Sequence, residues 1–444
     1  MIPDISVFDY LIGFIYFFLI FFFAFVYKNK KEETDDTYQY FMPALSAKVI
    51  GGFGFLLLSL YYWKGGDTFT YYQGADQFSF FILENPTDGL SLLFTSAKNI
   101  SWSSYEFANG LHGFLSSNDS FTTVKIVAII NIFCFRSFIV TTIVFSSISF
   151  LGVWNMYFAF CKIYPHLKKQ LLFAFFFIPS VILWGSGILK DTITIAAIGW
   201  LIYGFINIVI LKRKQKKSLI IILLATLFIA LLKPYILYIL FPSLFIWVQS
   251  NLKEMIPNKL IRKIMAPFVA IILVVSSFYL SQKLSQNAGK YDINKIGNTL
   301  EGFQSWHQSL AATRDQSGYT LGHMELTPVG IFKKIPAAIN VTFFRPYLWE
   351  VRNSSTLLGA FEGTLLIILS FWLILKYRFR LLKMIFKNKD ILFLLIFSFT
   401  FAVMVGISSY NFGALSRYKM PAQMFFIIAI ILILDKTKKS NSIF

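Results

Sequence analysis

A carboxylate placed just after two glycines is the first group in this sequence that could do chemistry. Gly65 and Gly66 let the backbone turn freely, and they follow an apolar stretch, so we expect Asp67 at the mouth of a helical bundle. If a helix continues from there, Tyr71 lies on the same face as Asp67. Such a carboxylate could take a proton from a hydroxyl group or help to hold a divalent cation. It could also simply cap the helix that follows.

A second candidate site lies in residues 179–191. Gly185 and Gly187 interrupt an apolar stretch immediately before Lys190 and Asp191. Free amides at a helix N-terminus attract phosphate, so a lysine beside such an end predicts a phosphate site. Capping of the next helix would explain Asp191, but it would not explain the lysine.

A third candidate closes a long polar segment at residues 342–352. Arg345 and Arg352 carry planar forks that suit a pyrophosphate group. Glu362 follows within an apolar stretch, and a carboxylate inside a membrane is usually retained for function. Trp349 and its neighbours could alternatively form an aromatic belt at the membrane interface.

A fourth candidate is the short polar connection 411–421. Arg417 and Lys419 form a compact cationic pair with Tyr418 between them. Short connections tied to rigid helices are well suited to phosphate binding, although contact with lipid headgroups would also explain the pair. Lys233, at a break in another apolar stretch, is expected to add a cation on the same side.

Other familiar chemistries are not indicated. The four histidines lack the spacing of a zinc site; His307 and His323 could act as acid or base groups, but a solvated loop position explains them as well. Both cysteines lie in apolar stretches, so neither a disulfide framework nor a cysteine metal site is expected. No phosphate-binding P-loop, dinucleotide fingerprint or serine nucleophile motif occurs. We therefore expect no certain cofactor, with a divalent cation at Asp67 as the exception.

The elements that must position these groups are membrane helices. The chain has 444 residues, of which 56% are hydrophobic and 14% charged, whereas soluble domains average roughly 25% charged residues. A spanning helix needs about 20 mostly apolar residues, so the sequence predicts an all-α polytopic membrane protein with about eleven spans in one integral domain, residues 1–444. The expected spans are 8–27, 46–63, 137–161, 171–188, 191–211, 218–232, 235–250, 264–282, 356–376, 391–410 and 419–435.

Two parts of this topology leave alternatives open. The segments 218–232 and 235–250 are short and meet at Lys233, so they form either a tight hairpin or one bent element. The stretch 122–135 contains a lysine and an asparagine, so a helix near the membrane interface is preferred there over another span.

The net charge of +19 is explained by where the basic residues fall. Six basic runs end up on one side of the eleven-span topology and hold more than half of the 41 Lys and Arg residues, and cytoplasmic loops collect such residues. We therefore expect an external N-terminus and a cytoplasmic C-terminus. Contact with anionic headgroups explains this rim, and nucleic acid is not expected as a partner. The runs are 28–31, 162–169, 212–217, 253–263, 376–389 and 436–439.

Two long polar segments, 64–121 and 283–355, are expected as external loops. The first is acidic and the second is basic on balance. An acidic loop facing a basic loop over an apolar bundle suits a substrate that is part lipid, part phosphate and part polar group, and long loops in compact proteins tend to be functional.

Three short motifs, at residues 66–72, 187–191 and 416–421, resemble those of a known group of proteins. The set is similar to the multi-span enzymes that build bacterial surface polysaccharides from polyprenyl-linked sugars. These enzymes include glycosyltransferases of the GT-C type and exopolysaccharide polymerases of the Wzy and EpsG kinds.

The resemblance implies a fold of the GT-C or Wzy kind in the bacterial cytoplasmic membrane. It also implies transfer of sugar units from a polyprenyl-pyrophosphate or polyprenyl-phosphate donor to a glycan acceptor, beside other polysaccharide-assembly proteins. In such enzymes an acidic residue in an external loop acts as base or metal contact, which corresponds to Asp67. External arginines hold the lipid pyrophosphate, which corresponds to Arg345 and Arg417. The side chains expected to bind substrate are Tyr71, Lys190, Asp191, Lys233, Arg352, Glu362, Tyr418 and Lys419.

Two other classes of function remain open. In a flippase or transporter of lipid-linked glycans, the intramembrane charges would line a path. A non-catalytic subunit of an envelope machine would explain the apolar bundle, but not cations kept on the outer face.

Overall fold

The computed structural model describes residues 5–109, 111–255, 302, 318–322 and 327–441, and every regular element in these ranges is a helix. One isolated β-bridge joins Gly318 to Asn411. Eight helices in the described ranges are long and apolar enough to cross a membrane, so the chain is a multi-pass membrane protein. They are Val7–Glu32, Asp36–Trp63, Phe138–Ile163, Lys190–Ile210, Gln215–Leu232, Thr356–Tyr377, Lys389–Ser409 and Met420–Thr437.

The expected single span over 171–188 is wrong. Two short helices occupy it, α8 (Lys168–Phe176) and α9 (Pro179–Trp184). A residue before proline avoids the helical conformation, and Ile178 is extended, with φ −76° and ψ 120°. Pro179 therefore starts a new helix, and Gly185 ends it within two turns.

The segments around Lys233 form two separate helices, α11 (Gln215–Leu232) and α12 (Tyr235–Met255). Lys233 ends α11 in a non-helical conformation, with φ −145°, because the residue before a proline disfavours the helical region. The apolar part of α12, Tyr235–Val248, is shorter than the eight spanning helices. The expected span 264–282 lies outside the described residues.

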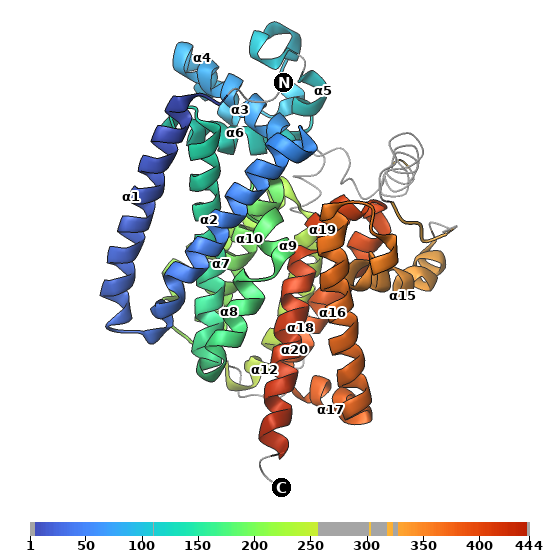
Figure 1. Cartoon of the computed structure of the whole chain (residues 1–444). Coiled ribbons are helices and arrows are strands. Elements are labelled where there is room, and N and C mark those ends of the chain that lie inside the picture. The colour runs from blue at the N-terminus through green and yellow to red at the C-terminus, as the bar shows by residue number, and fades with distance from the viewer. Residues whose placement is uncertain (1–4, 110, 256–301, 303–317, 323–326, 442–444) are drawn as a thin grey trace. The chain divides into compact units, whose positions relative to one another are not determined.

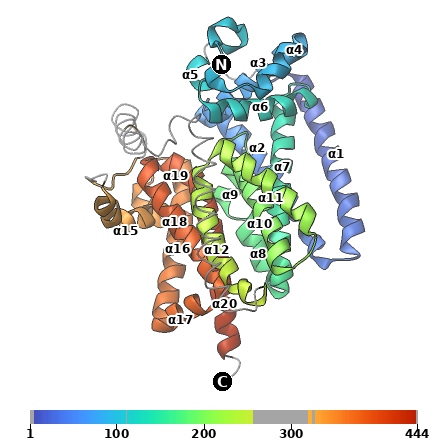
Figure 2. The ribbon, with the colours of Figure 1, turned by 180° about the vertical axis from the view of Figure 1, so that it is seen from behind.

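The described chain divides into two compact units, one ending at Pro234 and the other starting at Tyr235. In the N-terminal unit, α7 (Phe138–Ile163) packs against α1 (Val7–Glu32), α2 (Phe41–Leu57) and α10 (Lys190–Phe205), and α10 packs against α11 (Figures 1 and 2).

Small residues bring α7 and α10 unusually close. A Cβ on Gly152 would lie 2.3 Å from the Ala196 carbonyl oxygen, and a Cβ on Gly199 would lie 2.3 Å from the Gly152 carbonyl oxygen. Between apolar helices in a membrane, small residues permit this backbone contact and the dispersion attraction that goes with it. The contact places the start of α10, with Lys190 and Asp191, firmly within the unit.

The segment 64–121, expected as a loop, is largely helical. It contains α3 (Asp67–Glu84), α4 (Pro86–Phe94) and α5 (His112–Leu115), followed by α6 (Asn118–Phe133). α3 packs against α6, and these helices gather at one end of the bundle (Figures 1 and 2). With 16 residues, α6 is shorter than the roughly 20 that a span requires.

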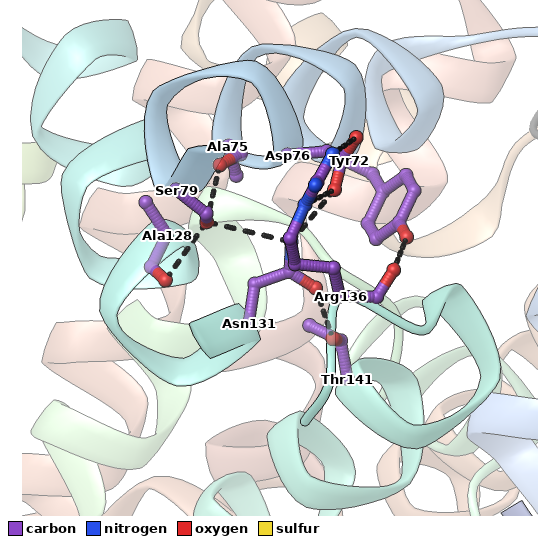
Figure 3. A network of polar contacts seen from close by, with 8 residues as sticks. All are labelled: Tyr72, Ala75, Asp76, Ser79, Ala128, Asn131, Arg136 and Thr141. Atoms are coloured by element: carbon purple, nitrogen blue, oxygen red, sulfur yellow. Dashed lines mark hydrogen bonds and ion pairs between the residues drawn. The ribbon is translucent and has the colours of Figure 1, made fainter. Parts of the chain in front are cut away.

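A polar network fixes α3 to the turn between α6 and α7 (Figure 3). Arg136 donates from Nε to Asp76 Oδ1 at 2.7 Å and from Nη2 to Asp76 Oδ2 at 2.8 Å. The Tyr72 hydroxyl donates to the Arg136 carbonyl oxygen at 2.5 Å, and Thr141 donates to Asn131 at 2.7 Å. Arg136 has φ 56°, so the bidentate pair stabilises a left-handed turn that an L-residue seldom adopts.

In the C-terminal unit, α18 (Lys389–Ser409) packs against α12, α15 (Pro328–Phe344) and α20 (Met420–Asn441). A Cβ on Gly406 would lie 2.4 Å from the Ala338 carbonyl oxygen, so α15 and α18 also touch through backbone. Part of the expected loop 283–355 is therefore a packed helix. α16 (Ser354–Tyr377), α17 (Phe379–Lys387) and α19 (Phe412–Tyr418) complete the unit.

Candidate functional site

Lys190 occupies the first position of α10, and its ammonium group is buried against acidic and polar side chains. Its Nζ donates to Asp119 Oδ2 at 2.6 Å and to Ser120 Oγ at 3.0 Å, and it lies 5.5 Å from the centroid of the Tyr71 ring. The N-cap of α10 is Leu189, without a side-chain cap bond, so the capping role considered for Asp191 is wrong.

A second buried ion pair lies next to the first. Lys233 donates to Asp191 Oδ1, and both side chains are almost fully buried. Asp191 follows Lys190 directly, so two lysine–aspartate pairs sit side by side where α6, α10 and the end of α11 meet. We call Asp119, Lys190, Asp191 and Lys233 the paired cluster.

The paired cluster brings four expected substrate contacts together, namely Tyr71, Lys190, Asp191 and Lys233. Sequence reasoning did not assign Asp119 as the partner of Lys190, because the two lie 71 positions apart. The available signal was an aspartate at the start of a predicted helix, before its apolar stretch. Each lysine faces a carboxylate, so the cluster carries little net charge to attract phosphate.

Lys48 is a charged group that sequence reasoning missed. It lies inside a spanning helix and is 1% exposed. Its Nζ donates to the Gly185 carbonyl oxygen at 2.8 Å, and Ser149 Oγ donates to the same oxygen at 2.9 Å. These two donors satisfy a carbonyl that the break between α9 and α10 leaves without a helical partner.

Asp67 lies in the first turn of α3, after Gly65 with φ 159° and Gly66 with φ 106°. The N-cap is Gly66, so Asp67 does not cap the helix. The side chain of Asp67 is exposed, which corrects the expectation that the bundle mouth shelters it, whereas Tyr71 one turn later is buried. Among the described residues, no group of three or more His, Cys, Asp or Glu side chains is arranged to hold a metal ion.

Arg345 ends α15, and its guanidinium faces an acidic side chain of the same turn. Nε donates to Glu350 Oε2 at 2.9 Å, and Nη2 forms a close ion pair with Oε1. Glu350 also accepts from the Tyr347 backbone amide at 2.9 Å. The fork expected to hold pyrophosphate thus has a partner in the protein. Arg352 is exposed.

The Arg345–Glu350 pair makes the C-terminal unit sensitive to acid. Partial burial alone would raise the pKa of the Glu350 carboxyl, but hydrogen bonds from Arg345 and the Tyr347 amide outweigh it and hold that pKa below its usual value. The pair's stabilisation is therefore present above the pKa of an unfolded glutamate, about 4.3, and is lost as pH falls through the lower folded value.

We expect Glu350→Gln to have a lower melting temperature than the wild type at pH 7, and the difference to shrink as the pH falls below about 4. Thermal melting of both proteins in the same detergent over this pH range measures the effect. Glu84→Gln, at an exposed glutamate on α3, is the control and should change little. A difference that stays constant with pH would contradict the proposed ionic contribution of Glu350.

The second cluster surrounds the start of α20. Glu362, in the third turn of α16, accepts from Gln423 Nε2 at 2.8 Å, and both residues are buried. Lys419, at the junction of α19 and α20, is 0% exposed. Its Nζ has neither an ion-pair nor a hydrogen-bond partner among the described residues. We call Glu362, Arg417, Lys419 and Gln423 the cation cluster.

Burial lowers the pKa of the Lys419 ammonium, and the Glu362 carboxylate partly opposes that shift. Glu362 is therefore close enough to act electrostatically on Lys419. Arg417 Nη2 donates to the Tyr418 hydroxyl at 2.9 Å, so these predicted residues also contact each other. A buried cation without a hydrogen-bond partner costs free energy unless it is compensated.

The predicted residues thus fall into separate groups. Asp67 belongs to the N-terminal unit, whereas Arg345 and Arg417 belong to the C-terminal unit. His307 and His323 lie outside the described residues. Gln423 was missed, because a glutamine inside an apolar helix carries no charge signal.

A comparison of this chain with protein-family models, curated proteins and solved structures finds no match.

Proposed function

We propose that this protein is a membrane glycosyltransferase or glycan polymerase that uses polyprenyl-linked donors. In this proposal, sugar units pass from a polyprenyl pyrophosphate or polyprenyl phosphate to a glycan acceptor at the outer face of the bacterial cytoplasmic membrane. The proposal includes a fold of the GT-C or Wzy kind and contact with other polysaccharide-assembly proteins. The observation that carries it is the buried ammonium of Lys419.

The position of Lys419 supports a lipid-linked anion as its partner. It immediately precedes the span Met420–Thr437, and therefore lies near the boundary of the hydrocarbon region. A polyprenyl phosphate holds its phosphate at this depth, because its chain remains in the membrane. A soluble anion would have to leave water to reach a fully buried ammonium.

The cation cluster also has the groups that such a transfer requires. A sugar on a lipid pyrophosphate already has a good leaving group, so the protein must stabilise the charge on the departing phosphate. Lys419 and Arg417 supply positive charge for that purpose. Glu362 can accept a hydrogen bond from an acceptor hydroxyl and receive its proton late in the reaction. Asp67 is the alternative base, on the strength of the sequence resemblance.

The orientation we propose places the N-terminus outside and the C-terminus in the cytoplasm. The basic run 376–389 leads up to the start of α18, whereas Arg417 follows the end of α18. These basic residues therefore lie at opposite ends of this spanning helix. Lys and Arg collect on the cytoplasmic side, so the run at the start of α18 supports a cytoplasmic assignment for that end. The cation cluster then belongs to the outer side.

A flippase or transporter of the same lipid-linked glycans is the second candidate, and the paired cluster favours it. Charged side chains within a membrane protein commonly mark a path for substrate or protons. The buried lysines of that cluster and Lys48 would belong to such a path.

Analysis of lipid-linked glycans in a deletion strain separates these candidates. Loss of a polymerase should leave single repeat units on the outer leaflet, and loss of a flippase should trap them on the inner leaflet. A normal polymer with no accumulated intermediate would contradict both candidates.

The two candidate bases can be distinguished in the same strain. We expect Glu362→Gln to reduce polymer formation by at least 100-fold if Glu362 receives the proton, since general base catalysis contributes about 10²–10⁴-fold. Asp67→Asn should then retain activity, and the reverse pattern would assign the base to Asp67. Quantified polymer length and yield measure this, with protein abundance in the membrane as the control. Full activity in both variants would contradict either assignment.

A further inference from the structure

The short helix α17 (Phe379–Lys387) is constrained by its place in the chain. It connects α16 to α18, and both neighbours contain spanning segments, Thr356–Tyr377 and Lys389–Ser409. The connection from one span's end to the next span's start must lie near the membrane boundary. Both views place α17 at the end of the unit where α20 runs towards its C-terminus (Figures 1 and 2).

The backbone turns sharply between α16 and α17. Arg378 ends α16 with φ 43° and ψ −131°, so α17 does not continue the axis of the spanning helix. α17 contacts both α16 and α18. A helix that leaves the axis of a span at the membrane boundary is free to lie along the membrane surface.

The side chains of α17 separate into an apolar face and a basic face. Phe379, Leu382 and Phe386 follow an i, i+3, i+7 spacing, which places them on one side of a helix. Their exposed fractions are 87%, 52% and 70%. Basic residues follow the same spacing one position later, at Arg380, Lys383 and Lys387, and all three are exposed.

The charge around α17 is not balanced by nearby acids in the sequence. Residues 376–389 contain six Lys and Arg residues and no acidic residue. The acid that follows is Asp390, whose Oδ1 accepts from Trp247 Nε1 at 2.6 Å. A short helix with large apolar side chains on one face and cations on the other matches the boundary between acyl chains and anionic headgroups.

We propose that α17 is an in-plane membrane helix that binds anionic phospholipid headgroups of the leaflet at this end of the unit. The two phenylalanines and Leu382 enter the acyl boundary, while Arg380, Lys383 and Lys387 contact lipid phosphates. The negative charge of the lipid headgroups balances the positive charge of residues 376–389, which contain no acidic residue. This proposal does not depend on the reaction that the protein catalyses.

Lipid binding by the full-length protein tests the electrostatic part. We expect the variant Arg380→Gln, Lys383→Gln, Lys387→Gln to bind phosphatidylglycerol at least tenfold more weakly in low salt than the wild type, since each basic residue near an anionic surface adds to the attraction. Binding to phosphatidylcholine should not change. The matched control is Lys64→Gln, Lys98→Gln, Lys333→Gln, which removes equal charge from exposed positions outside the six basic runs and should retain this affinity. Unchanged phosphatidylglycerol binding in the α17 variant would overturn the proposal.

A measurement of the depth of α17 in the membrane tests, independently of that variant, whether its apolar face enters the acyl boundary. A nitroxide is attached to Phe386→Cys in a protein whose native cysteines are alanine, and the protein is reconstituted into phosphatidylglycerol vesicles. At position 386 we expect oxygen to relax the nitroxide more strongly than a water-soluble nickel complex does. For a nitroxide on Lys383→Cys we expect the nickel complex to be the stronger relaxant. Nickel-dominated relaxation at both positions would place α17 in water and overturn the proposal.

Discussion

Lys419→Met should make the protein more resistant to heat while removing its activity. The Lys419 ammonium is fully buried and has no hydrogen-bond partner among the described residues. Methionine keeps much of the volume of lysine and removes the buried charge. Replacing buried ionic groups by apolar ones of similar size often stabilises proteins by about 1–4 kcal/mol. In the proposed reaction, the same substitution removes the group that holds the departing phosphate, so polymer formation should stop.

The pH dependence of melting tests whether the buried charge of Lys419 causes the difference in stability. Because burial lowers the pKa of Lys419, the unfolded chain binds more protons than the folded one between that lowered value and about 10.4, the pKa of an unfolded lysine. Wild-type stability should therefore rise with pH in that window relative to the variant. The advantage of Lys419→Met should be largest near neutral pH and should shrink in alkaline buffer.

A matched variant separates the effect of burial from the loss of a lysine. Lys376→Met removes the same charge at an exposed position near the end of α16, where it should leave activity intact and change the melting temperature little. Melting in detergent and polymer analysis in cells are the two measurements. A Lys419→Met protein that is less stable than the wild type and still active would show that Lys419 is compensated within the protein and has no role in transfer.

The sequence alone predicts a spanning helix well where a segment is both long and apolar. Eight of the expected spans occur because a long apolar segment must satisfy its backbone hydrogen bonds within a helix. The failure at 171–188 has a local cause, because Pro179 and Gly185 interrupt an apolar run that hydropathy alone treats as continuous. Segment 64–121 was expected as a loop because it is too polar to span a membrane, yet α3 and α6 form a helical layer there.

The candidate sites divide in a similar way. Lys190, Asp191, Glu362 and Lys419 were recognisable, because a charge beside or inside an apolar stretch is costly and therefore conspicuous. The contacts of Lys190, Asp191 and Glu362 were not, since these ion pairs and hydrogen bonds join distant segments. Lys190, which the sequence predicts as a phosphate ligand, forms an ion pair with Asp119, and the sequence does not indicate this pair.

The paired cluster should be among the most sensitive parts of the N-terminal unit. Asp119→Leu leaves the Lys190 ammonium buried beside an apolar side chain, and breaking a buried ion pair in this way typically costs 3–5 kcal/mol, as an order of magnitude. Lys190 keeps its bond to Ser120, but a hydroxyl compensates an ammonium much less than a carboxylate does. We therefore expect a large drop in the melting temperature of Asp119→Leu.

A double-mutant cycle distinguishes lost pairing from lost packing. The variant Asp119→Leu, Lys190→Met contains no unpaired charge at this position, so it should recover most of the stability that Asp119→Leu loses. Asp36→Leu is the control, because Asp36 pairs with Lys168 but its side chain is 73% exposed, and exposed pairs contribute about 0–1 kcal/mol. Unfolding free energies of the wild type, Asp119→Leu, Lys190→Met, the double variant and Asp36→Leu, all in the same detergent, measure these effects. If the double variant lost as much stability as the two single variants together, the two residues would contribute independently, and the cluster would not act as a charge pair.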